Sequence, residues 1–264
     1  MHQQDTSGVT QRSPATDPAL SSAIRRGRAL AAKGKYKAAA DEVAAAFAQQ
    51  AGPPGGVRLV LAGCTRSGKT ILAERLAATT GYALLPGDRL RQLYWELEDP
   101  HTRRRARRQI VTRILETFPG GLILEGVSFH MKNEAAHGDR GAVSLALMRK
   151  LRDAGLADVV VVGNARSSVE QKCRALEAHR ATGKCWTTNA VFGKRYSDPA
   201  ALAKLAHNII RRSRILRDKA ASAGIPYLEI RPDAFEADIA AHLAMLRARL
   251  ETAESHHQTV RLNT

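Results

Sequence analysis

The sequence has few cysteines, and this shortage excludes two kinds of small, crosslinked protein. Only Cys64, Cys173 and Cys185 occur in 264 residues. An odd, sparse set without paired spacing argues against a disulfide framework and against a zinc site, and it suits a reducing compartment. We therefore expect a cytoplasmic protein, although the acid-poor N-terminal part is also compatible with an organelle transit peptide.

Long apolar runs and aromatic side chains are also scarce. No segment approaches the roughly 18 consecutive apolar residues of a membrane-spanning helix, so we expect no membrane span. Phe, Trp and Tyr together make up 5% of the chain, whereas apolar residues as a whole make up 44%. That content is sufficient for a buried core, which must be built mainly from Ala, Leu, Ile and Val.

Acidic residues are outnumbered by basic ones. The chain has 25 Asp and Glu against 41 Lys and Arg, which gives a formal net charge of +16. This surplus favours anionic partners, whether nucleotides, phosphorylated metabolites or nucleic acid. The charge alone does not distinguish among these partners, and the sequence leaves the oligomeric state open.

The N-terminal part differs in character from the rest of the chain. Residues 1–20 are polar and lack apolar periodicity, so we expect a disordered tail. Residues 21–52 predict a helical extension of one or two helices and a linker, in which Gly34 either divides two helices or marks a turn. Residues 53–264 are expected to form one further domain.

In that domain, short apolar runs alternate with segments of helical periodicity. Such alternation predicts an α/β fold in which a five-stranded parallel sheet lies between helices. The expected strands span residues 57–62, 82–87, 121–126, 157–163 and 225–230. The expected helices span residues 68–81, 88–118 with a break at Pro100, 142–155, 167–182, 198–223 and 234–252.

The residues after the first expected strand have the spacing G-x-x-x-x-G-K-[ST] of a phosphate-binding loop (P-loop). Its glycines let the backbone turn sharply, so that successive N–H groups point at phosphate oxygens. Lys69 is then expected to reach the β- and γ-phosphates, and the Thr70 hydroxyl to bind Mg²⁺. The predicted nucleotide-binding residues are Gly63, Cys64, Thr65, Arg66, Ser67, Gly68, Lys69 and Thr70.

Two positions within this loop have no assigned purpose. Cys64 is either one of the loop's variable positions or an oxidation-sensitive switch, since loop amides can lower the pKa of a thiol. Arg66 matches no requirement of the motif.

Signatures of several other nucleotide-binding classes are absent from the sequence. It contains no N-K-x-D element of switch GTPases and no L-S-G-G-Q element of transporter ATPases. The third expected strand ends in LILEG, which has the single acid Glu125 instead of the Asp-Glu pair of many motors. These absences argue against switches, transporters and motors.

The segment PGDRLR, residues 86–91, resembles the acceptor-side element of nucleoside monophosphate kinases of the adenylate-kinase type. The matching residues are Gly87, Asp88, Leu90 and Arg91, while Pro86 replaces the usual threonine. The segment ILEGV, residues 123–127, is similar to small-metabolite kinases such as 2-phosphoglycerate kinases. The resemblance implies a P-loop small-molecule kinase that uses ATP and Mg²⁺, in which Arg91 binds an anionic acceptor.

The candidate residues are expected to meet at one edge of the sheet. Ligands of open parallel sheets bind at the carboxyl ends of the strands, where Gly63, Asp88 and Glu125 all lie. Glu125 either holds Mg²⁺ through water or caps a turn. Asp88 either accepts the proton of an attacking hydroxyl, orients Arg91, or caps the following helix.

Arginines are the expected stabilisers of the charge that develops during phosphoryl transfer. The resemblance implies an acceptor-binding segment at about residues 88–118 and a lid at about residues 165–200. The arginine-rich stretch 101–115 is then either part of the acceptor-binding segment or a solvated basic helix. The candidate catalytic arginines are Arg174 and Arg180 in the lid region and Arg211 and Arg214 in the next helix.

The main hypothesis is thus transfer of a phosphoryl group from ATP to a small, anionic acceptor. Three alternatives remain at this stage: a nucleic-acid kinase or NTPase, a toxin-type kinase of nucleotide sugars, and a non-catalytic nucleotide-binding regulator. Few aromatic residues are interleaved with the arginines, which argues against binding of single-stranded nucleic acid.

Overall fold

The structure is a computed structural model that describes residues 18–48, 56–127, 145–181 and 198–262. The expected tail up to residue 17, most of the expected linker, Cys185 and the second half of the expected lid lie outside the described residues. In the part of the chain that is described, no helix is long and apolar enough to cross a membrane.

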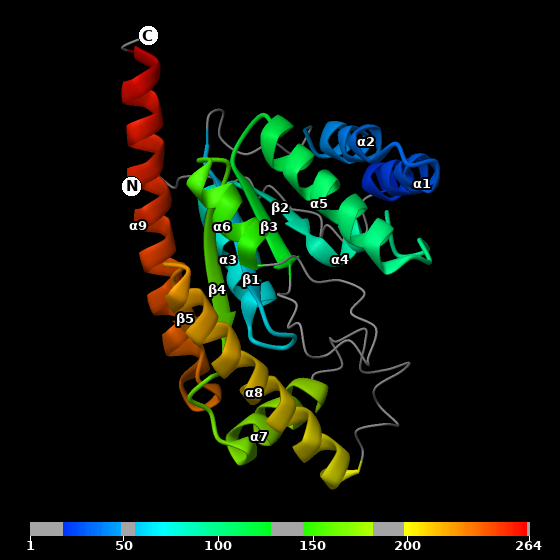
Figure 1. Cartoon of the computed structure of the whole chain (residues 1–264). Helices are drawn as coiled ribbons and strands as arrows, with labels where there is room; N and C mark the ends of the chain where they lie inside the picture. Colours follow the sequence, from blue (N-terminus) through cyan, green and yellow to red (C-terminus); the bar gives the residue numbers. More distant parts are fainter. Residues whose placement is uncertain (1–17, 49–55, 128–144, 182–197, 263–264) are drawn as a thin grey trace, which may run out of the picture.

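A sheet of five parallel strands lies at the centre of the molecule, as the sequence predicts (Figure 1). The strand order is β2-β3-β1-β4-β5. The central strand β1 therefore pairs with β3 on one side and with β4 on the other. The strands are β1 (Arg58–Gly63), β2 (Ala83–Pro86), β3 (Leu122–Val127), β4 (Asp158–Gly163) and β5 (Tyr227–Glu229).

Helices cover both faces of the sheet because the inner strands are apolar on both sides. One face, with Leu59 and Leu61 of β1, packs against α3 (Lys69–Thr80) and α9 (Phe235–Leu262). The other face, with Val60 and Ala62, packs against α4 (Gly87–Arg91), α5 (Pro100–Thr117), α6 (Leu145–Asp153) and α8 (Pro199–Ser222). Helix α9 continues beyond its expected end at residue 252.

The carboxyl ends of the strands form one edge of the sheet, and α7 (Val169–Ala181) and the beginning of α8 extend beyond it (Figure 1). The single-turn helix η4 (Pro232–Ala234) follows β5 at the same edge. Helix α5 begins at the expected break, since Pro100 is its first residue and the Asp99 side chain accepts hydrogen bonds from the backbone N–H of His101 and Thr102. The topology thus leaves the loops after the strands together at one edge.

The N-terminal extension is a helical hairpin that joins the main core. Helices α1 (Pro18–Ala32) and α2 (Tyr36–Ala48) are joined by a turn at Gly34, which has a φ of +72°. Their apolar sides belong to the same buried cluster as α4 and α5. Asp41 of α2 also accepts a hydrogen bond of 2.7 Å from Arg113 of α5. The expectation of a tail to residue 20 is wrong for residues 18–20, because Pro18 opens α1 and Leu20 is buried.

Candidate active site

The P-loop connects β1 to α3, and two of its glycines have conformations that other residues adopt with strain. Gly63 has a φ of +150° and Gly68 a φ of +91°. A Cβ atom on Gly63 would lie 2.0 Å from the carbonyl oxygen of Val162 in β4. The first glycine of the motif is therefore required by the close approach of two strands, and the second by the turn into α3.

Lys69 and Thr70, the first residues of α3, converge on Glu125 of β3. The Thr70 hydroxyl donates a hydrogen bond of 3.0 Å to Oε1 of Glu125, and Lys69 Nζ lies 3.5 Å from the same oxygen. Lys69 Nζ also donates to the carbonyl oxygen of Cys64 over 3.3 Å. The structure thus brings together the predicted phosphate-binding lysine and both predicted metal ligands.

The alternation of side chains along β3 explains why Glu125 meets α3. Ile123, two residues earlier, belongs to the buried cluster on the α3 face, whereas Leu124 belongs to the cluster on the opposite face. Glu125 therefore lies on the α3 side of the sheet, at the end of the strand. The side chains of Lys69 and Glu125 are only 11% and 8% exposed, so this ion pair is largely shielded from water.

The residues of the loop fit a nucleotide phosphate and Mg²⁺. Within the described ranges, the Ser67 hydroxyl is buried and has no hydrogen-bond partner. The Thr70 hydroxyl and the Glu125 carboxylate supply the oxygen ligands that Mg²⁺ prefers. The N-terminal end of α3 adds the positive end of the helix dipole next to Lys69.

The acceptor-side motif lies next to this cluster. In the sheet, Pro86 at the end of β2 pairs with Glu125. A Cβ atom on Gly87 would lie 2.6 Å from the Glu125 carbonyl oxygen, so a side chain at this position has no room. The glycine of GDRLR therefore allows α4 to begin directly beside the Lys69–Glu125 pair.

Asp88 and Arg91 both lie on α4, one turn apart. Arg91 Nη1 is 3.9 Å from Oδ1 of Asp88, and its guanidinium lies 4.4 Å from the centre of the Trp95 ring. The Asp88 side chain is 67% exposed, which leaves it accessible to an acceptor. The long, exposed Asp88–Arg91 contact is weak, whereas the cation–π contact with Trp95 orients Arg91.

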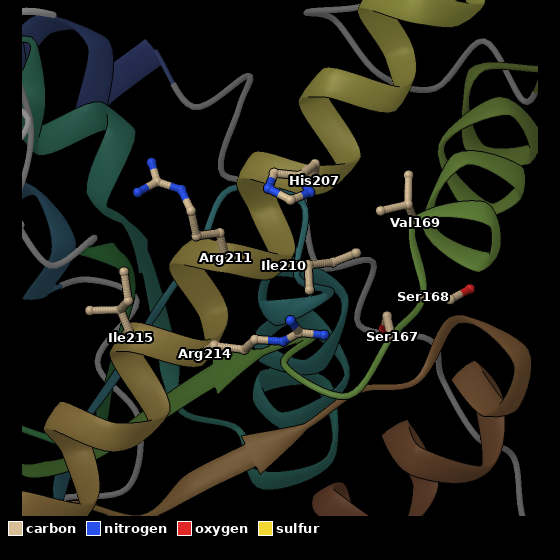
Figure 2. A pocket seen from close by; sticks show the side chains of 8 residues that line it. All are labelled: Ser167, Ser168, Val169, His207, Ile210, Arg211, Arg214 and Ile215. Atoms are coloured by element: carbon tan, nitrogen blue, oxygen red, sulfur yellow. The ribbon is translucent and has the colours of Figure 1, made fainter.

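The four candidate catalytic arginines lie on α7 and α8. Arg174 is exposed and pairs with Glu170 over 2.8 Å, while the side chain of Arg180 lies outside the described residues. Arg211 and Arg214 line a cavity of about 230 Å³ between α8 and the beginning of α7. Figure 2 shows Arg214 directed toward the loop that carries Ser167, whereas Arg211 projects away from that loop.

Cys64 is buried, and its burial raises the pKa of the thiol above the usual value. A hydrogen bond with Ser213 and the positive charge of Lys69 oppose this shift without reversing it. An oxidation-sensitive switch requires a lowered pKa, so the raised pKa argues against that hypothesis. The thiol packs in the core beneath the loop.

Two residues with contacts at this site were not predicted. Lys172 of α7 is buried, and its Nζ donates to the carbonyl oxygen of Arg66 over 2.6 Å. Glu74 lies one turn after Thr70 on α3, and partial burial together with the negative charge of Glu125 raises its pKa. The sequence offers only weak signals for them: Glu74 follows Thr70 by four positions, and Lys172 falls among the apolar positions Val169, Cys173 and Leu176 of α7.

No family model matches the sequence, and no curated protein matches it either. The solved structures that are similar to this one include the following three, and in each case the match covers 98% of the other chain. Shikimate kinase from Bacteroides thetaiotaomicron is 14% identical, with a TM-score of 0.45 over 74% of this chain. YorR protein from Bacillus subtilis, in complex with phosphorylated GDP, is 13% identical, with a TM-score of 0.46 over 75%.

The third structure is a gluconokinase from Sinorhizobium meliloti 1021, which is 16% identical, with a TM-score of 0.37 over 76% of this chain. At such identities and TM-scores these likenesses carry no argument about the activity of this chain. The activity is therefore inferred from the contacts of the site itself.

Proposed function

We propose that this protein is a kinase that transfers the γ-phosphoryl group of ATP, with Mg²⁺, to a small anionic acceptor. The observation that carries the proposal is the convergence of Lys69 and Thr70 on Glu125, beside a loop whose glycines are required by its geometry. A helix-capping turn would need neither a lysine that is largely shielded from water nor a buried carboxylate. The arrangement corresponds to the lysine, hydroxyl and acid of P-loop kinases and NTPases.

The donor side of the reaction depends on residues of the P-loop. Its amides and Lys69 bind the phosphates, and the Lys69 ammonium moves from Glu125 to phosphate oxygens as the nucleotide enters. The Thr70 hydroxyl and the Glu125 carboxylate are the groups that would hold Mg²⁺, and the metal would supply neutralisation of the phosphate charge.

The acceptor side depends on α4. Arg91, oriented by Trp95, binds the anionic group of the acceptor. Asp88 accepts the proton when the attacking group is a hydroxyl, and otherwise orients the acceptor. The segment from residue 88 to about 118 forms the acceptor-binding part, which the N-terminal hairpin supports from the side of α5.

The transferred group carries its charge on oxygens that arginines stabilise. We assign this role to Arg174 and Arg180 on α7, within the proposed lid at about residues 165–200, and to Arg211 and Arg214 on α8. Each of these arginines is tested by substitution with Lys, which retains the charge but loses the bidentate geometry.

The proposal is tested by measuring ATP consumption in the presence of nucleotides, sugar phosphates and phosphorylated acids. We expect one class of acceptor to stimulate the formation of ADP, and we expect Lys69→Ala to abolish it without loss of the fold. Lys150→Ala, at an exposed position on α6, is the matched control and should retain the activity. Unchanged turnover in Lys69→Ala would contradict the proposal.

A further inference from the structure

A buried ammonium group lies directly behind the P-loop. Lys172 of α7 is 5% exposed, and its Nζ donates to the Arg66 carbonyl oxygen over 2.6 Å and to Oδ1 of Asn164 over 2.9 Å. Neither of these acceptors carries a negative charge. Buried lysines are rare unless a carboxylate pairs with them, so this arrangement differs from an ordinary structural ion pair.

The residue that Lys172 holds has an unusual backbone conformation. Arg66 has a φ of +59°, and within the described ranges it is the only residue other than glycine with a positive φ. Such a conformation persists where the surroundings fix it. The hydrogen bond from Lys172 to the Arg66 carbonyl is one contact that fixes it.

The orientation of this carbonyl determines the orientation of the next amide. In a planar trans peptide, the C=O of Arg66 and the N–H of Ser67 point in opposite directions. When the carbonyl points back toward Lys172, the Ser67 N–H points away from Lys172. In a phosphate-binding loop the N–H groups point at the phosphate oxygens, so Lys172 sets one of these donors.

Lys172 is held in place through Asn164, which contacts three other elements of the fold. Its partner Asn164 follows β4 and donates from its side-chain amide to the Ile230 carbonyl oxygen after β5. The backbone N–H of Asn164 donates to the hydroxyl of Ser213 in α8 over 3.0 Å. Because contacts with β4, β5 and α8 fix Asn164, Asn164 in turn holds the Lys172 ammonium in a defined position against the P-loop.

We propose that Lys172 is a positioning residue for nucleotide binding, which holds the Arg66 carbonyl and thereby directs the Ser67 N–H and a buried positive charge toward the bound phosphates. This inference rests on the proposed nucleotide-binding function of the loop. It also links the conformation of the loop to α7, the helix that precedes the second half of the proposed lid.

The test compares Lys172→Met with Lys172→Arg and with the exposed control Lys150→Met. Methionine retains the length and the apolar stem but has no donor and no charge, whereas arginine retains both. The dissociation constant for Mg-ATP is measured by calorimetry on protein whose fold is checked by circular dichroism. We expect Lys172→Met to weaken binding about 10- to 100-fold, Lys172→Arg to restore part of the affinity, and Lys150→Met to bind as the wild type does.

A purely structural role would lower the melting temperature of Lys172→Met but leave the affinity of the folded protein unchanged, and this result would overturn the inference. If Lys172→Met does not fold, Lys172→Gln, which keeps a donor, takes its place. The expected result is then a smaller loss of affinity, and an unchanged affinity overturns the inference. A wild-type protein that binds no ATP would contradict the proposed function as well, whereas wild-type binding that Lys172→Met retains contradicts this inference alone.

Discussion

Replacement of Glu125 by Gln tests the donor side of the site, because it removes one charge and preserves the shape of the side chain. Glu125 is buried and the Lys69 side chain is only 11% exposed, with Oε1 and Nζ 3.5 Å apart. Removal of one partner of a buried ion pair costs about 3–5 kcal/mol. The side-chain amide in Glu125→Gln can still accept the hydrogen bond from Thr70, so we expect the free energy of unfolding without nucleotide to fall by about 2–3 kcal/mol.

The same substitution should weaken the metal site. Loss of a partner that holds the metal through water lowers metal affinity or activity about 10- to 100-fold. We therefore expect the concentration of Mg²⁺ that gives half-maximal turnover to rise by this factor in Glu125→Gln. Urea denaturation measures the first effect, and titration of turnover with Mg²⁺ at fixed ATP measures the second.

Glu236→Gln is the control for Glu125→Gln. Glu236 forms a surface ion pair with Arg75, and its side chain is 70% exposed. Such a pair contributes about 0–1 kcal/mol, so neither the stability nor the Mg²⁺ dependence should change much. If Glu125→Gln required no more Mg²⁺ than the wild type, Glu125 would have no part in the metal site.

Three further predictions concern other parts of the structure. Asp88→Asn should lower kcat/KM about 10²–10⁴-fold for a hydroxyl acceptor and much less for an acceptor phosphate, which is already ionised; an equal loss for both classes would argue against a base. Gly63→Ala places a Cβ atom 2.0 Å from a β4 carbonyl and should destabilise the fold by about 3 kcal/mol or more in urea denaturation. Gly81→Ala, which has open space and a φ of +72°, should lose only about 1–2 kcal/mol, and equal losses would refute the steric argument. Burial lowers the pKa of Lys172 from 10.5 to about 8. Between these two pH values the side chain is protonated in the unfolded chain but largely deprotonated in the folded protein. The unfolding free energy of the wild type should therefore rise relative to Lys172→Met between pH 8 and 10.5, by on the order of 3 kcal/mol, and a constant difference would contradict the lowered pKa.

The fold could be predicted because its strands are short apolar runs and its helices have a clear periodicity. DVVVVG, for example, is buried on both faces as β4, and this is the pattern of an inner parallel strand. The order of the strands had no comparable signal, because it depends on where each crossover returns to the sheet. The position of the N-terminal hairpin was also not predictable, since apolar stripes indicate a helix but not the helix against which it packs.

The donor side of the site could be predicted because the motif fixes both residue types and spacing. Lys69, Thr70 and Glu125 meet as the motif and the parallel sheet require. The burial of Arg107 in α5 was not predicted, because an arginine-rich helix suggests a solvated surface. This residue is only 6% exposed.

Lys172 could not be assigned from the sequence for a different reason. Its partner Arg66 is 106 positions away, and the accepting atom is a backbone carbonyl that no residue type encodes. A lysine within an apolar stripe was the only signal, and such a residue more often extends its charged end to solvent.

The central claim is tested most directly by acceptor-dependent formation of ADP in wild-type protein and in Lys69→Ala. We expect at least one small anionic acceptor to stimulate ADP formation by the wild type, and folded Lys69→Ala to lose this stimulation. A wild-type protein that binds Mg-ATP but forms no ADP with any class of acceptor would contradict the assignment as a kinase.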